Sequence, residues 1–130
     1  MILLIDSSGY EQLHFALIND KVKQQKIKIT HPETEKTLSH LEKFLKTNGV
    51  KLDAVNKIVV VSGPGSFTGI RVGVSMALAF SFAKNIPLYA IEKPKLPEKL
   101  SELANMKLQK VKDDFDPDYG AEPNITIKKK

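Results

Sequence analysis

Residues 61–77 have the sequence VSGPGSFTGIRVGVSMA. The segment starts as the end of an apolar, β-branched strand, passes through a glycine-proline turn and continues as a helix. Small residues recur at every fourth position, namely Gly65, Gly69, Gly73, Ala77 and Ser81. A glycine inside a helix costs about 1 kcal/mol relative to alanine. Two of them therefore need a reason, and the simplest is that another group approaches the helix backbone closely.

A phosphate site is one candidate reason, because backbone N–H groups at a glycine-rich turn and the helix dipole point at an anion. The turn fits that role poorly. A Walker loop requires Lys and then Ser or Thr after its last glycine, but Ile70 follows Gly69. Three residues separate Gly65 from Gly69, where the dinucleotide fingerprint has two, and Pro64 removes one donor.

Packing is the competing reason. Small residues four apart form an inclined groove on a helix, and a ridge of a neighbouring helix can enter it. The same helix has a bulkier row, which we expect to face the chain's own sheet: Ile70, Val74, Leu78 and Phe82. A helix that is apolar nearly all round needs cover on two sides. The small-residue row therefore either seats the helix tightly on its own sheet or docks a partner.

The composition is that of an ordinary soluble globular chain, and 130 residues make one domain. The absence of cysteine excludes disulfides and thiolate metal sites. The net charge of +5 comes from lysines, and Arg71 is the only arginine. Because base reading and phosphate clamps favour arginine, we expect these lysines mainly to solubilise the protein. The absence of cysteine fits a cytoplasmic protein, and the apolar run at residues 1–5 is too short for a signal peptide or a membrane span.

The hydrophobic pattern predicts one mixed sheet with helices. The predicted strands are Met1–Ile5, His14–Ile18, Val22–Ile29, Lys57–Val61 and Pro87–Ile91. One helix is predicted to start near Thr30 and to stop at Gly49, and the small-residue helix is predicted to end near Asn85. Three antiparallel strands followed by helix, strand, helix and strand, with right-handed crossovers, predict an α/β fold of the ribonuclease H-like or actin-like (ASKHA) class in a single lobe.

The pattern weakens beyond Glu92. Four leucines, at positions 96, 100, 103 and 108, are compatible with one amphipathic helix. The remaining residues are polar and rich in turn formers, which predicts an extended tail. The chain is thus divided into a lobe over 1–92, a helix over 93–112 and a tail over 113–130.

Asp6 ends the first predicted strand, where carboxylates of open sheets can bind a metal or a phosphate-linked water. A two-metal site needs carboxylates from other strands, and the strand at 57–61 offers none. We therefore expect Asp6 to anchor its own turn by accepting hydrogen bonds from nearby N–H groups. Neither the histidines nor the serines have the spacing of a metal or catalytic site. No catalytic or metal residue is predicted, and the weak candidates for a bound nucleotide are Asp6, Gly63, Gly65 and Ser66.

Two segments resemble the TsaB family, also called YeaZ. They are Ile2–Ser8, which reads ILLIDSS, and Gly63–Gly73, which reads GPGSFTGIRVG and is the more specific match. The helix over Leu38–Val50 and the strand at Pro87–Tyr89 also fall where the family has them, so the resemblance covers residues 1–92. Pro117-Asp118-Tyr119 is similar to the proline-tyrosine tail near the family's C-terminus.

The resemblance implies a non-catalytic subunit that binds and activates a TsaD-like threonylcarbamoyl transferase, which makes threonylcarbamoyladenosine (t6A) in tRNA. It implies a heterodimer through the first two helices, a TsaE-like ATPase in a larger complex, contact with tRNA only through the complex, and no cofactor. A homodimer using the same groove is another possibility. The interface candidates are Leu38, Leu41, Leu45, Gly69, Gly73, Ala77 and Phe80.

The chain departs from the family pattern in two ways. Family members usually have a second lobe of comparable size, so this chain is expected to be a shortened, one-lobed member. TsaD has metal-binding histidines just past the strand that matches Leu88–Ile91, where this chain reads Glu92-Lys93-Pro94-Lys95. We therefore expect no transferase or peptidase chemistry. The alternative is a small nucleotide-binding protein or enzyme of the actin-like superfamily that uses Asp6 and the Gly63–Gly69 loop.

Overall fold

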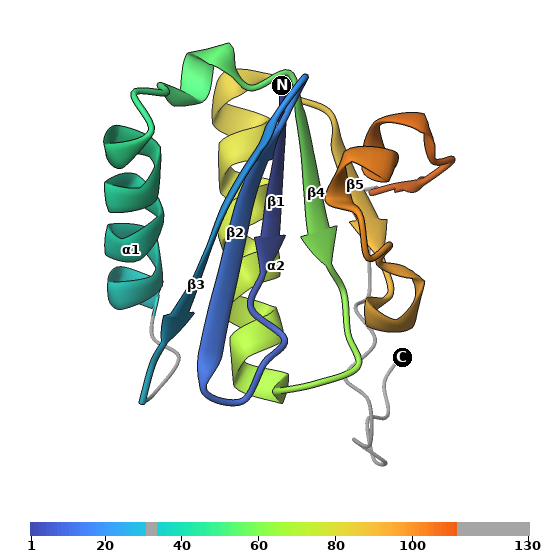
Figure 1. Ribbon diagram of the computed structural model, residues 1–130. Helices are drawn as coiled ribbons and strands as arrows, with labels where there is room; N and C mark the ends of the chain where they lie inside the picture. Colours follow the sequence, from blue (N-terminus) through green and yellow to red (C-terminus); the bar gives the residue numbers. More distant parts are fainter. Residues whose placement is uncertain (31–33, 112–130) are drawn as a thin grey trace.

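A computed structural model describes residues 1–30 and 34–111 of the chain (Figure 1). The strands are Ile2–Asp6 (β1), Gln12–Ile18 (β2), Val22–Lys28 (β3), Lys57–Val61 (β4), Leu88–Ile91 (β5) and Gln109–Lys110 (β6). The α-helices are Thr34–Thr47 (α1) and Phe67–Lys84 (α2). Three short 3₁₀ helices are Leu52–Ala54 (η1), Lys93–Lys95 (η2) and Leu100–Asn105 (η3). No helix within the described ranges is both long and apolar enough to cross a membrane.

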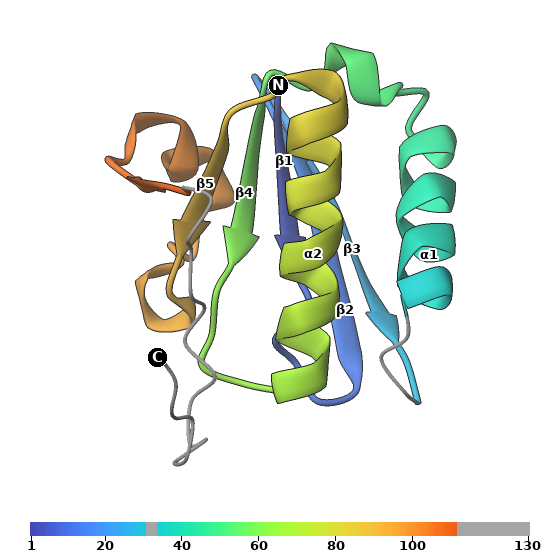
Figure 2. The same cartoon turned by 180° about the vertical axis from the view of Figure 1, so that it is seen from behind.

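The strands form one sheet in the order β3-β2-β1-β4-β5-β6. β1 pairs antiparallel with β2 and parallel with β4, in the register Leu3↔Leu17 and Leu3↔Ile58. β2 pairs antiparallel with β3, β4 pairs parallel with β5, and β6 adds a short antiparallel edge. Both α-helices cover one face of the sheet and η3 covers the other, as Figures 1 and 2 show from opposite sides. The predicted mixed α/β fold is confirmed.

The core has two layers because successive side chains of a strand point to opposite faces. Leu3 and Ile5 of β1 join the cluster under the α-helices, whereas Ile2 and Leu4 join the cluster under η3. All five residues of β1 are buried, as the continuous apolar run requires of a central strand. β3 is mostly exposed and has lysines along it, which is typical of an edge strand.

Residues 93–111, the described part of the predicted helix at 93–112, do not form an amphipathic helix. The described part consists of η2, η3 and β6, with Leu100 and Leu103 buried against the sheet. Pro94 and Pro97 lack a backbone N–H, and each disfavours the α conformation of the residue before it. A 3₁₀ helix has three residues per turn, so two leucines three apart lie on the same side of it. The tail predicted for 113–130 lies outside the described residues.

Candidate functional site

The glycine-rich turn between β4 and α2 lies against the end of β1. The Ser66 N–H donates to the Ser8 carbonyl at 2.8 Å, and the Ser7 hydroxyl donates to the Gly69 carbonyl at 2.7 Å. The Ser66 hydroxyl caps α2, because it accepts a hydrogen bond from the Gly69 N–H at 3.1 Å. The Ser66 N–H, the Ser66 hydroxyl and the Gly69 N–H, which could have faced a phosphate, therefore bond within the chain.

The glycines permit this close approach. A Cβ built on Gly69 would lie 2.3 Å from the Ser7 carbonyl oxygen, and one on Gly73 would lie 2.0 Å from the Ser7 hydroxyl oxygen. A Cβ on Gly65, whose φ is +157°, would lie 2.2 Å from the Ser8 carbonyl oxygen. The group that approaches the helix is thus the chain's own segment after β1.

This packing corrects the expected orientation of α2. Gly69, Gly73 and Ala77 are buried against the chain's own sheet, so they do not form an outward groove for a partner. In the bulkier row Ile70 is buried, but Leu78 is 37% exposed and Phe82 is 92% exposed. A helix turns about 100° per residue, so a row of every fourth residue drifts by about 40° at each step. The row consequently starts at the sheet and ends in solvent.

Asp6 anchors its turn, as predicted. Its side chain is nearly inaccessible, and its Oδ1 accepts from the Ser8 N–H at 3.0 Å and from the Ser8 hydroxyl at 2.5 Å. Its Oδ2 forms an ion pair with the Lys93 ammonium, which sequence reasoning missed. The Lys93 N–H also donates to the Gly63 carbonyl at 2.8 Å. Within the described ranges, no group of three or more His, Asp or Glu side chains could hold a metal ion.

Asp6, Ser8 and Lys93 together are called the Asp6 corner below. His14 lies beside it, opposite Asp6 in the register of β1 and β2. Its Nε2 is 2.8 Å from the Gln24 side-chain oxygen of β3. Burial lowers the pKa of His14 below its ordinary value, and the bond to Gln24 and the charge of Asp6 oppose that shift only in part. Lys26 and Lys93 lower the pKa of His14 further. The folded protein therefore favours a neutral imidazole.

An apolar groove of about 500 Å³ lies between α1, η1 and α2. Its apolar lining consists of Leu38, Leu41, Leu45, Val50, Leu52 and Phe80. Gly49, at φ +67°, lets the chain leave α1 and turn towards η1. The structure thus brings together four of the seven predicted interface residues: Leu38, Leu41, Leu45 and Phe80.

The four residues contribute differently to the groove. Leu41 and Leu45 are buried and belong to the core cluster, so they form its base. Leu38 and Phe80 are partly buried and pack against the same cluster. Phe82, one of the exposed residues of α2, was not among the predicted interface residues. The available signal was the same 40° drift, which carries the end of the bulky row to the outer side of α2.

Known proteins match part of this chain in sequence. The model of the TsaD family, described as tRNA N6-adenosine threonylcarbamoyltransferase, matches residues 28–95. The TsaB protein of Escherichia coli, named for tRNA threonylcarbamoyladenosine biosynthesis, is 31% identical over 91 residues, which cover 69% of this chain and 39% of that protein. The uncharacterized MG208 homolog of Mycoplasma pneumoniae is 37% identical over 93 residues, which cover 68% of this chain and 47% of that protein.

A solved structure also resembles this chain. YeaZ from Pseudomonas aeruginosa matches with a TM-score of 0.64 and 28% identity, over 70% of this chain and 43% of that one. The matched region spans less than half the length of each of these relatives. The family model covers just over half of the chain, and the relatives and the solved fold agree with it. This chain therefore belongs to the TsaB (YeaZ) family.

Proposed function

We propose that this chain is a non-catalytic cytoplasmic subunit in the synthesis of t6A in tRNA, and that it acts by binding and activating a TsaD-like transferase. The names of its TsaB relatives support the pathway, and the match to the TsaD family model supports a related partner. The observation that carries the docking role is the α1–α2 face, defined here as the groove between α1, η1 and α2 together with the exposed Leu78 and Phe82 of α2. Both residues are two positions from Phe80, or about 200° around the helix, so they lie on the flank of α2 opposite the groove.

The α1–α2 face has the physical character of a protein interface. Exposed aromatic side chains and apolar grooves are usual anchors of binding, because their burial releases water from a large apolar surface. Burying a Phe side chain contributes about 1.5–3 kcal/mol. Phe82 leaves nearly all of that contribution unused in the isolated chain. A partner helix that lies along the outward side of α2 would contact Phe82 on one flank and the groove beside Phe80 on the other.

The non-catalytic role is supported by the state of the Asp6 corner. The Asp6 carboxylate is neutralised by Lys93 and held by Ser8, and Ser66 caps a helix. A nucleotide site at the Gly63–Gly69 loop would require these contacts to be replaced. The TsaE-like ATPase and the homodimer stay predictions from the family resemblance.

A binding measurement tests the proposal. Phe82→Ser should weaken binding to the TsaD homologue of the same organism by at least about tenfold, since about 1.4 kcal/mol corresponds to a factor of ten in Kd. Isothermal titration of the two purified proteins gives that Kd. Tyr10→Ser is the matched control, because Tyr10 is also an exposed aromatic residue, at 73%, but lies in the turn between β1 and β2.

Three outcomes would contradict the proposal. Equal affinities of the Phe82→Ser variant and the unchanged protein would mean that the partner does not pack along the outward side of α2, which contradicts the proposal. No binding by the unchanged protein, with t6A made at full rate in its absence, would refute the role as a subunit. ATP turnover by the isolated chain would favour the alternative of a nucleotide-using enzyme.

A further inference from the structure

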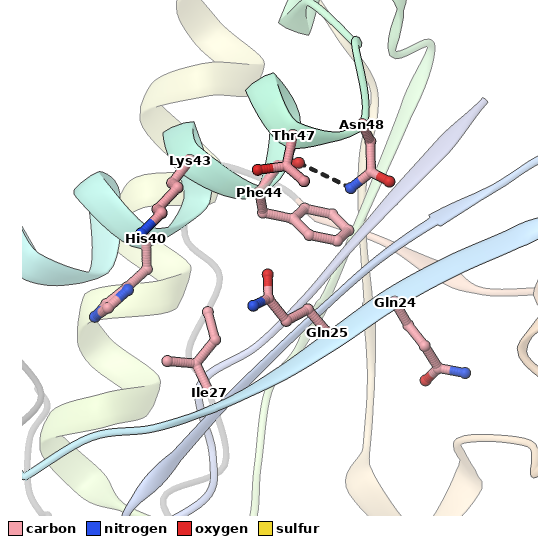
Figure 3. A pocket seen from close by; sticks show the side chains of 8 residues that line it. All are labelled: Gln24, Gln25, Ile27, His40, Lys43, Phe44, Thr47 and Asn48. Atoms are coloured by element: carbon pink, nitrogen blue, oxygen red, sulfur yellow. Dashed lines mark hydrogen bonds between the residues drawn. The ribbon is translucent and has the colours of Figure 1, made fainter.

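A second, polar cleft lies between β3 and α1, on the other side of α1 from the apolar groove (Figure 3). It has a volume of about 400 Å³ and continues at His40 into a smaller hollow of about 210 Å³. Gln25 and Ile27 extend into it from β3, and His40 and Lys43 extend from α1 (Figure 3). Asn48 closes one end, where its side-chain amide donates to the Phe44 carbonyl at 2.8 Å.

The lining of this β3–α1 cleft is cationic and rich in hydrogen-bonding groups. The polar residues that line the two hollows are Gln24, Gln25, Lys28, Thr30, Lys36, Thr37, His40, Lys43, Thr47 and Asn48. None of the lining residues within the described ranges is a carboxylate. β3 and α1 together carry six lysines and two glutamates, an excess of four positive charges in a chain whose net charge is +5.

We infer that the β3–α1 cleft binds the phosphodiester backbone of RNA, an inference that rests on the proposed role in tRNA modification. Lysine ammonium groups attract phosphates as point charges and release bound counterions. Amide and hydroxyl side chains both donate and accept hydrogen bonds, so they suit phosphate oxygens and ribose 2′-hydroxyls. The outer edge of β3 has no neighbouring strand in the described sheet, and backbone N–H groups are common phosphate donors.

The fold explains why the sequence did not indicate this cleft. Lys28 and Lys43 are fifteen positions apart and look dispersed along the chain. The pairing of β3 at the sheet edge and the packing of α1 beside it bring Lys43 to the larger hollow and Lys28 to the smaller hollow, which meet at His40. An acidic protein segment would also be attracted by lysines. Gln24 points away from the cleft and is bonded to His14 (Figure 3). Six of the other nine polar lining residues carry amides, hydroxyls or an imidazole rather than lysine ammonium groups, which favours RNA.

The test measures binding of a fluorescently labelled anticodon stem–loop RNA to the full chain by anisotropy, at about 50 mM and 200 mM salt. The variant is Lys28→Gln/Lys43→Gln, and the matched control is Lys99→Gln/Lys107→Gln, which removes the same charge from exposed residues just before and just after η3. The cleft variant should bind roughly tenfold more weakly at the lower salt. Its slope of log affinity against log salt should fall by about 1.4, from two lost contacts at roughly 0.7 each.

Each other result overturns the inference. Equal losses in both double variants would mean that RNA responds to net charge alone. Absence of RNA binding by the unchanged chain, alone and with its TsaD-like partner, would refute the cleft as an RNA site. Displacement of the RNA by poly-glutamate at equal charge concentration would indicate an acidic protein instead. Titration of the cleft variant with the TsaD-like partner keeps the two proposals separate, because intact partner binding leaves the proposed function standing when the RNA result fails.

Discussion

At the scale of single residues, Ser7 and Asp6 account for the properties of the glycine-rich turn. Ser7 lies under α2 and makes any side chain at Gly69 or Gly73 impossible without a shift. Asp6 holds the turn that presents Ser7 and is itself held by Lys93. Sequence reasoning predicted the turn-anchoring role of Asp6 because short carboxylates commonly bond the N–H two residues on. It could not predict Lys93, which is 87 positions away in the chain.

The titration of His14 gives a prediction at this scale. Burial lowers the pKa of His14 in the folded protein, so below the ordinary pKa of about 6.5 the unfolded chain takes up a proton that the folded chain does not. The free energy of unfolding should therefore fall as the pH decreases from 7 to about 5.5, by at most about 1.4 kcal/mol per pH unit. Urea unfolding of the unchanged protein and of His14→Gln measures this slope. The slope should flatten in His14→Gln, and an identical slope would contradict the assignment.

At the scale of elements, α2 is the part that the sequence predicted in outline but not in orientation. Its start at the turn and its end near Asn85 were predictable, because a Ser cap and a left-handed terminal Asn are local signals. Which row faces the sheet was not predictable, because it depends on contact with Ser7, a residue far away in sequence. The residues after β5 failed as a predicted helix for a local reason that the sequence contained, namely Pro94 and Pro97.

The close packing of α2 on β1 predicts a stability effect. Gly69→Ala should destabilise the protein by about 1–3 kcal/mol, because the new Cβ meets a backbone carbonyl oxygen that cannot rotate away. Ser75→Ala, on the exposed side of the same helix, should change stability by less than about 0.5 kcal/mol. Thermal unfolding of both variants compares them directly. Equal stability of Gly69→Ala and the unchanged protein would show that the helix does not lie this close to β1.

At the scale of the whole molecule, three surfaces have different properties. The α1–α2 face is apolar, the β3–α1 cleft is cationic, and the corner at Asp6 is filled by internal contacts. Four predicted interface residues meet at the α1–α2 face. Three of them are leucines that helical spacing places on one side of α1, which is why the sequence could predict them. Gly69, Gly73 and Ala77 were predicted on the wrong side of α2, since small size alone does not tell a tight internal contact from a docking groove.

Site-specific photocrosslinking tests the central claim that the chain acts through its α1–α2 face. A photoreactive phenylalanine analogue replaces Phe82 in one variant and Pro64, an exposed residue of the glycine-rich turn, in the other. Each variant is mixed with the TsaD homologue of the same organism and irradiated. We predict a crosslinked heterodimer from position 82 and none from position 64. A crosslink from position 64 without one from position 82 would contradict this account and return the site of action to the turn.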